Sequence, residues 1–312
     1  MTDYVIAVDG GGSKTDVVAV GLDGTVLATA RGGGSSPQII GLAKAVAVVS
    51  ALVDEVSAGE PARTHVYLSG LDLPAEIDAF SSAFPWRSEA VVDNDLFALL
   101  RAGTNDHNAV AVVCGTGINA VGVRADGATA RFPALGNISG DWGGGWHLGE
   151  QALWHAARGD DGRGPRTLLE QLIPRVYDLA TITEVIEALH FERLPIAELH
   201  RLAFELLDAA EAGDAVAASV VDRQVDEIVT MAAVALQRLD LLGQEVPVVL
   251  GGGVLAAGYP RLNDGVTAGL AERAPLAHIR LVTERPIVGA TLLALEAAGA
   301  SSPALEAARG SL

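Results

Sequence analysis

Cysteine is almost absent from this sequence, because Cys114 is the single cysteine among 312 residues. One thiol excludes a disulfide within the chain and any paired-cysteine metal or redox motif. It fits a reducing cytosol, so we expect a cytoplasmic protein. The first residues, MTDYVIAVDGGG, have Asp3 where a signal peptide would carry positive charge, and we expect no export signal there.

Basic residues are also scarce. The chain has 21 Lys and Arg against 39 Asp and Glu, which gives a formal net charge of -18 at pH 7. The resulting negative potential repels nucleic acids and anionic membrane surfaces, so we expect neither as a partner. Any phosphate that the protein binds must therefore be held locally, by backbone N–H groups and a cation.

Long apolar runs are missing as well. The apolar stretch at 42–53, LAKAVAVVSALV, is interrupted by Lys44 and is shorter than the ~20 residues of a membrane span. It predicts a core helix. The whole sequence is 50% hydrophobic and 19% charged, which is typical of a folded globular protein and excludes general disorder.

Glycine is abundant instead, with 36 residues that gather in short runs. The first run lies between two β-branched segments, and Asp23-Gly24 follows them, so this region predicts strands joined by tight turns. The same order of segments recurs at 108–132. Gly12 and Gly115 are 103 positions apart, and so are the two Asp-Gly pairs, of which the second begins at Asp126. This spacing indicates an internal duplication of a whole domain.

Strands and helices alternate along the rest of the chain, which predicts an α/β fold with parallel crossovers. We expect two domains, 1–105 and 106–312, with the last helix as a candidate to cross back to the first. We expect residues 300–312 to fray. The remaining expected elements are strands at 64–69, 89–92, 246–250 and 278–282, helices at 42–57, 74–83, 95–102 and 287–298, and a helical insert at 167–242.

Three glycine loops follow predicted strands. The segment from Asp9 to Thr15 lies at a hairpin tip, where glycine lets backbone N–H groups approach an anion. It is not a Walker loop, because a strand rather than a helix follows it. Alone it could be an ordinary glycine turn. Gly115–Gly117 and Gly251–Gly253 are further loops of this kind, and three together favour nucleotide binding.

Duplicated hairpins and a late glycine turn resemble the layout of the acetate kinase, sugar kinase and actin superfamily. Over nearly its whole length the chain resembles the BadF/BadG/BcrA/BcrD-type ATPase family, and within it the N-acetylglucosamine kinase branch. The resemblance implies two duplicated ribonuclease-H-like domains of the actin-like ATPase fold, with an interdomain cleft and the helical insert in the second domain. It also implies ATP and Mg²⁺ as cofactors, and a homodimer.

The resemblance assigns the nucleotide contacts as well. Asp9 is expected near the Mg²⁺ ion. The first phosphate motif comprises Gly11, Gly12, Ser13, Lys14 and Thr15, the second comprises Gly115, Thr116 and Gly117, and the adenosine motif includes Gly252 and Gly253.

A strand-to-helix junction in VVDNDLFALL, at 91–100, supplies the candidate base. Asp95 could simply cap the helix. The family pattern of Asn followed by Asp falls on Asn94 and Asp95, so the resemblance makes Asp95 the base that takes the proton of the attacking sugar hydroxyl. We expect Asp93 to be structural. The residues expected at the sugar are Ser36, Asp95, Asn119, Gly140 and Asp141.

Two departures from the family pattern concern the sugar. Trp142 stands where the family usually has glutamate, and it could stack on a sugar face or merely pack. Ser36 stands where the kinase branch commonly has asparagine, so one hydroxyl replaces an amide.

The expected function is an ATP-dependent kinase for an amino sugar, first N-acetylglucosamine, giving the 6-phosphate, and second glucosamine or another hexose. One alternative is an ATPase that activates a 2-hydroxyacyl-CoA dehydratase-type enzyme. That class shares an iron–sulfur cluster across a dimer and needs two cysteines per subunit, so the single cysteine disfavours it. Another alternative is a nucleotide or sugar sensor without enzymatic activity.

Overall fold

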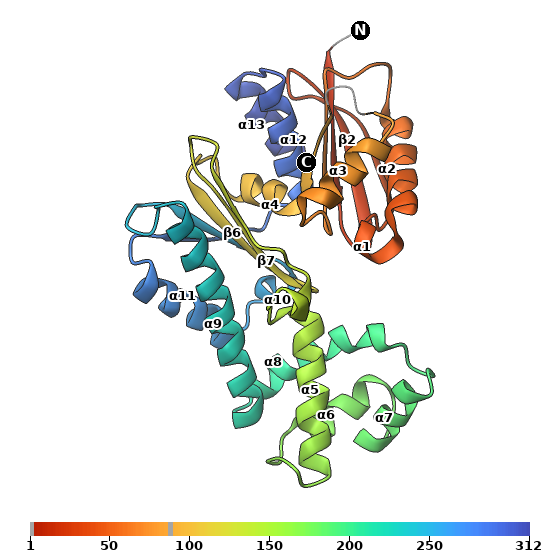
Figure 1. The fold of residues 1–312 in the computed structure, drawn as a ribbon, viewed down its shortest axis with the longest axis vertical. Helices are drawn as coiled ribbons and strands as arrows, with labels where there is room; N and C mark the ends of the chain where they lie inside the picture. Colours follow the sequence, from red (N-terminus) through yellow and green to blue (C-terminus); the bar gives the residue numbers. More distant parts are fainter. Residues whose placement is uncertain (1–2, 87–89) are drawn as a thin grey trace. The chain divides into compact units, whose positions relative to one another are not determined.

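The computed structural model describes residues 3–86 and 90–312 (Figure 1). The chain divides into two compact units, Met1–Ala111 together with Val282–Leu312, and Val112–Leu281. Within these described ranges, no helix is both long enough and apolar enough to cross a membrane.

The first unit is built on a five-stranded sheet in the order β3-β2-β1-β4-β5. Strands β1, β2 and β3 are antiparallel neighbours, whereas β4 and β5 run parallel to β1. The strands are β1 (Tyr4–Gly10), β2 (Lys14–Gly21), β3 (Val26–Gly33), β4 (Arg63–Leu68) and β5 (Ala90–Asn94). The expected strand at 89–92 is present from Ala90, and residue 89 lies outside the described residues.

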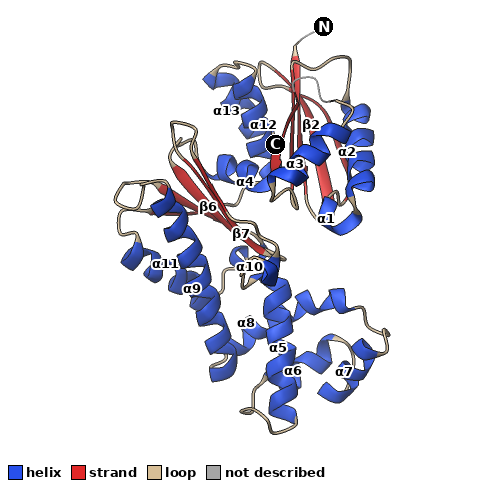
Figure 2. Ribbon diagram, in the orientation of Figure 1, coloured by secondary structure: helices blue, strands red, loops and turns tan. Residues whose placement is uncertain are grey.

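Helices cover both faces of this sheet (Figures 1 and 2). Successive side chains of a strand point to opposite faces, so Ile6 and Val8 of β1 join the core under α2 and α3, whereas Val5 and Ala7 join the core under α4 and α12. This explains why β1 is apolar without alternation. The helices are α1 (Pro37–Ile40), α2 (Leu42–Val56), α3 (Pro74–Ala83), α4 (Asp95–Gly103), α12 (Pro286–Ala297) and α13 (Ser302–Ser311).

The C-terminal segment belongs to the first unit. The expectation that residues 300–312 fray is wrong, because they form α13, with Ala304 and Ala308 buried. Arg309 on this helix donates to the carbonyl of Ala102 at 2.9 Å and pairs with Glu284 at 2.6 Å. These contacts hold the chain end in place.

The second unit repeats the first sheet, in the order β10-β9-β6-β7-β8. Each strand has its counterpart at the same place in the first sheet, so the duplication is confirmed. The strands are β6 (Ala109–Cys114), β7 (Ile118–Val123), β8 (Thr129–Arg131), β9 (Pro247–Gly251) and β10 (His278–Leu281).

The Asp-Gly turns of the two copies have the same geometry. Gly24 and Gly127 have φ of 88° and 89°, a region that favours glycine. The Asp23 carboxylate accepts from the N–H of Thr25 at 3.0 Å, and the Asp126 carboxylate accepts from that of Ala128 at 3.1 Å. The predicted α/β class is confirmed.

The helical insert lies in the second unit, between β8 and β9. Its longest helix, α9, buries Val221, Ile228 and Leu236 on one face, as the periodicity of its sequence predicts. The α-helices of the unit are α5 (Gly144–Asp160), α6 (Leu169–Val176), α7 (Ile182–His190), α8 (Leu202–Glu211), α9 (Ala215–Arg238), α10 (Gly253–Ala256) and α11 (Pro260–Arg273), and Gly136–Ile138 and Ile196–Arg201 form short 3₁₀ turns.

Candidate functional site

The first glycine loop joins β1 and β2, which pair antiparallel with Gly10 opposite Thr15. The loop is therefore a hairpin followed by a strand, as expected. Gly12, Ser13 and Lys14 are exposed at its tip, and Gly11 donates its N–H to the carbonyl of Lys14 at 2.9 Å. Exposed N–H groups at such a tip can bind phosphate oxygens.

Thr15 has a different environment from the rest of this loop. Its side chain is fully buried, and its hydroxyl donates to the carbonyl of Gly33 at 2.7 Å and lies 2.8 Å from Ser35 Oγ. Ser35 in turn donates its N–H to the carbonyl of Gly11 at 3.0 Å. The Thr15 side chain thus holds the hairpin to the neighbouring chain segment.

Two predicted acidic residues meet at one edge of the first sheet. Asp9 is near the carboxyl end of β1, and Asp95 begins α4 directly after β5, which lies one strand beyond β4. Burial raises the pKa of Asp9 to about 7, with Asp16 adding to it. Burial also raises the pKa of Asp95 to about 8, and the charges of Asp9 and Asp72 contribute. The Asp9 carboxylate is thus close enough to Asp95 to raise the pKa of Asp95.

Asn94, rather than Asp95, caps α4. Its side-chain oxygen accepts the N–H of Leu96 at 3.0 Å, and its amide nitrogen donates to Asp72 Oδ1 at 2.9 Å. The capping function that could have explained Asp95 is therefore carried by its neighbour. Asp93 accepts the N–H of Asn94 at 2.7 Å, which fits the structural part expected of it.

Asp72 is a residue of this site that the sequence reasoning missed. Besides Asn94, it accepts a hydrogen bond from Gln38 Nε2 at 3.1 Å. Glu76 Oε2 accepts the N–H groups of Asp72 and Leu73 at 3.0 and 2.9 Å, which fixes the start of α3. A Pro at the first helical position with Glu two residues later is a helix-start signal that could have directed attention to this loop.

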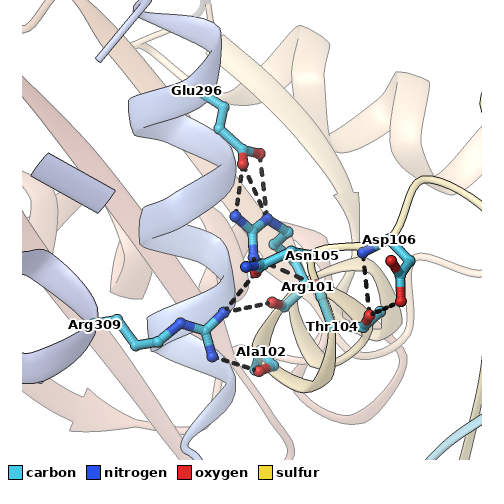
Figure 3. A network of polar contacts seen from close by, with 7 residues as sticks. All are labelled: Arg101, Ala102, Thr104, Asn105, Asp106, Glu296 and Arg309. Carbon is cyan, nitrogen blue, oxygen red and sulfur yellow. Dashed lines mark hydrogen bonds and ion pairs between the residues drawn. The ribbon is translucent and has the colours of Figure 1, made fainter. Parts of the chain in front are cut away.

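The far end of α4 is anchored to the C-terminal helices (Figure 3). Arg101 pairs with Glu296 of α12 at 2.6 Å. Arg309 of α13 donates to the carbonyls of Ala102 and Arg101 at 2.9 and 3.3 Å and to Asn105 Oδ1 at 3.2 Å. The helix that begins with Asp95 is thus held from both ends.

In the second unit, three glycine segments interlock. Gly145 and Trp146 donate their N–H groups to the carbonyls of Gly115 and Thr116 at 2.7 and 2.9 Å. Gly144 has φ of 80°, and a Cβ there would lie 2.4 Å from the Gly117 carbonyl carbon. The Gly115–Gly117 loop is therefore packed directly on the start of α5, and only glycine allows this approach.

The third glycine loop packs against the same segment. Gly252 has φ of 95°, and a Cβ there would come within 2.4 Å of the Cys114 carbonyl oxygen. The structure thus brings Gly115, Thr116 and Gly117 together with Gly252 and Gly253, as expected for loops that share one ligand.

A cavity of about 260 Å³ lies beside the Gly115–Gly117 loop. Its walls include Thr116, Asn137, Asp141, Trp146, His147 and Glu150. Asp141 Oδ2 accepts the N–H of Gly136 at 3.0 Å and the hydroxyl of Ser139 at 2.5 Å. The predicted sugar contact Asp141 therefore lies in a cavity wall with its carboxylate held in place.

The four other expected sugar contacts, Ser36, Asp95, Asn119 and Gly140, do not line this cavity. Asn119 follows Ile118 on β7, and its side-chain oxygen accepts the N–H of Ala120 at 2.7 Å. Ser36 belongs to the first unit, where it is buried at the start of α1.

Trp142 packs within the protein. The side chain is 8% exposed, and its ring lies between the Arg223 guanidinium, 4.3 Å from the ring centroid, and the His147 ring at 4.7 Å. Gln224, beside Arg223 on α9, accepts the N–H of Gly144 at 2.9 Å. Trp142 is absent from the cavity walls, so of the two alternatives for this residue the structure favours packing.

Cys114 ends β6 and is fully buried. Burial raises the pKa of its thiol to about 12, so a thiolate ligand is disfavoured at neutral pH. Within residues 3–86 and 90–312, no three His, Cys, Asp or Glu side chains form a group able to hold a metal ion.

Residues 6–294 match the BadF/BadG/BcrA/BcrD ATPase family. The chain belongs to this family. It is 27% identical over 320 residues to an N-acetyl-D-glucosamine kinase of Dictyostelium discoideum, covering 94% of this chain and 98% of the relative. It is 26% identical over 261 residues to an N-acetylmuramic acid/N-acetylglucosamine kinase of Clostridium acetobutylicum, covering 81% and 85%.

A solved structure supports the same family fold. A Chromobacterium violaceum protein, named provisionally as an N-acetylglucosamine kinase, superposes with a TM-score of 0.71 at 26% identity, covering 94% of this chain and 99% of that one. Together with the repeated sheet order, this confirms the predicted fold of two duplicated ribonuclease-H-like domains.

Proposed function

We propose that this protein transfers the γ-phosphoryl group of ATP to a hydroxyl of an amino sugar, most simply N-acetylglucosamine to give the 6-phosphate. The observation that carries the proposal is Asp95, a half-buried carboxyl group beside Asp9 whose pKa is raised to about 8. The relatives from Dictyostelium discoideum and Clostridium acetobutylicum, both named as kinases that act on N-acetylglucosamine, support the choice of substrate.

Asp95 acts as the general base in this proposal. A base is most effective when its pKa is near the working pH, because it then accepts a proton readily and is still deprotonated often enough to do so. Asp95 accepts the proton of the sugar hydroxyl as that oxygen attacks the γ-phosphorus. Asn94 and Asp72 hold the start of α4 and thereby orient the carboxylate.

Backbone N–H groups hold the nucleotide. The exposed tip of the first hairpin, from Gly11 to Lys14, is the first phosphate motif, and Gly115–Gly117 form the second. Gly252 and Gly253 contact the adenosine. Such groups suit a chain of net charge -18, because they neutralise phosphate locally.

Asp9 fits a Mg²⁺ ion that arrives with ATP. Its carboxyl group is half-buried, and burial and the charge of Asp16 raise its pKa more than the charges of Lys14 and Arg285 lower it. Mg²⁺ in phosphoryl-transfer sites is usually held by one or two carboxylates, phosphate oxygens and waters. When bound, Mg²⁺ would offset the charge on the transferred phosphate. We also propose a cytoplasmic location, from the single cysteine, and a homodimer, from the family resemblance.

The test is ADP release with ATP and Mg²⁺ in the presence of N-acetylglucosamine, glucosamine, N-acetylmannosamine, glucose or no sugar. We expect strong stimulation by an amino sugar. Asp95→Asn should lower kcat by ~10²–10⁴ while sugar binding persists. Asp78→Asn is the matched control, because Asp78 is exposed on α3 of the same unit and loses the same charge. Full turnover by Asp95→Asn would refute the assignment of the base.

A further inference from the structure

Glu150 is a cavity residue that the motifs do not single out. It lies on α5, one turn after His147, and both side chains line the cavity that also contains Asp141. Residues three positions apart share one face of a helix. Two carboxylates and an imidazole therefore contribute to the walls of one cavity.

The carboxylates of Asp141 and Glu150 differ in their hydrogen-bond partners within the protein. Asp141 accepts hydrogen bonds from Gly136 and Ser139. No residue in the described part of the chain forms a hydrogen bond or an ion pair with the Glu150 carboxylate. A half-buried carboxylate without such a partner loses hydration without compensation. Such a carboxylate is stabilised most by a ligand that supplies a charged hydrogen-bond donor.

The cavity has no cation of its own to neutralise these acids. No Lys or Arg lines it. Burial lowers the pKa of His147 although the charge of Glu150 opposes this shift, so the charged imidazolium is disfavoured. Arg223 stacks on the Trp142 ring and does not reach the cavity wall. The walls thus have a net negative charge that is complementary to a cationic ligand.

We propose that Glu150 binds the amino substituent of the sugar and thereby determines whether the enzyme accepts a hexosamine with a free ammonium group. This inference rests on the proposed amino sugar kinase function. An ammonium offers three donors and a full charge to a carboxylate, whereas an acetamido group offers one neutral N–H. Three apolar residues of the cavity walls, Ile118, Ala134 and Trp146, can pack against the sugar ring or an acetyl methyl group.

The test compares glucosamine with N-acetylglucosamine in the full-length enzyme. Glu150→Gln keeps the size of the side chain and removes its charge. We expect the ratio of kcat/KM for glucosamine to that for N-acetylglucosamine to fall ~10- to 100-fold in this variant, the range of a lost charge-assisted hydrogen bond. Glu272→Gln is the matched control, since Glu272 is exposed on α11, and its ratio should remain that of the wild type.

Failure of the part assigned to Glu150 can be distinguished from failure of the proposed kinase function. If the wild type phosphorylates N-acetylglucosamine but Glu150→Gln leaves the ratio unchanged, the part assigned to Glu150 is refuted and the kinase function stands. If the wild type phosphorylates neither sugar, the proposed function and this inference both fail. Unequal folding of the variants cannot produce the expected result, because both rate constants come from the same preparation and only their ratio is compared.

Discussion

Gly289 should be essential for the position of the candidate base, although it lies on α12, far along the chain from Asp95. It is buried on α12, where this helix crosses α4. A Cβ at Gly289 would lie 1.8 Å from the carbonyl oxygen of Ala98 and 2.6 Å from the nitrogen of Ala102. Both atoms are backbone of the helix that begins with Asp95, so no side chain can rotate away to make room.

The size of the effect follows from these distances. Ordinary contacts of a Cβ begin near 3.4 Å, so Gly289→Ala must push α4 and α12 apart by roughly 1.5 Å. Overpacking of this kind costs about 1–3 kcal/mol of unfolding free energy. Misplacing a catalytic group by ~1 Å can lower the rate by ~10²-fold. We therefore expect a lower melting temperature and a kcat reduced ~10- to 100-fold, with KM for ATP little changed.

Thermal unfolding and steady-state kinetics of the purified variant measure both effects. Gly310→Ala is the matched control, because it makes the same substitution in the neighbouring helix α13 at a position with nothing within 4 Å. This control should keep the wild-type kcat. If Gly289→Ala matches the wild type in melting temperature and kcat, the reasoning that α12 sets the position of α4 is refuted.

Two further predictions concern protonation and the glycine loops. The pKa values of Asp9 and Asp95 are raised to about 7 and 8, so the folded chain keeps protons that the unfolded chain loses near pH 4. In the absence of divalent cations, the free energy of unfolding should therefore fall as the pH rises from about 4 to 8. Melting in a chelator should show a smaller fall for Asp95→Asn, and an equal fall would contradict this. Gly252→Ala should raise KM for ATP at least ~10-fold because of its φ of 95° and the Cys114 carbonyl, whereas Gly243→Ala, which meets nothing within 4 Å, should not.

Much of the fold could be predicted because it is encoded locally. The 103-residue spacing of the duplicated turns, the glycine hairpin and the periodicity of α9 each depend on neighbouring residues, whose propensities and turn geometry set the structure. Asp95 was assigned as the base from the family's Asn-Asp pattern at a strand-to-helix junction, and that assignment remains a prediction. The assignment of residues to the sugar remains a prediction.

Only the tertiary structure decided which distant residues meet. Asp72 contacts Asn94 across 22 positions, and Arg101 pairs with Glu296 across 195, through packing that no local pattern specifies. Trp142 is in sequence the neighbour of Asp141, yet its ring packs against Arg223 while Glu150 lines the cavity. The sequence determined the loops and the duplicated sheets, because short-range propensities suffice for them. Which side chains line the cavity depended on helix packing, because helix packing places residues that are far apart in the chain side by side.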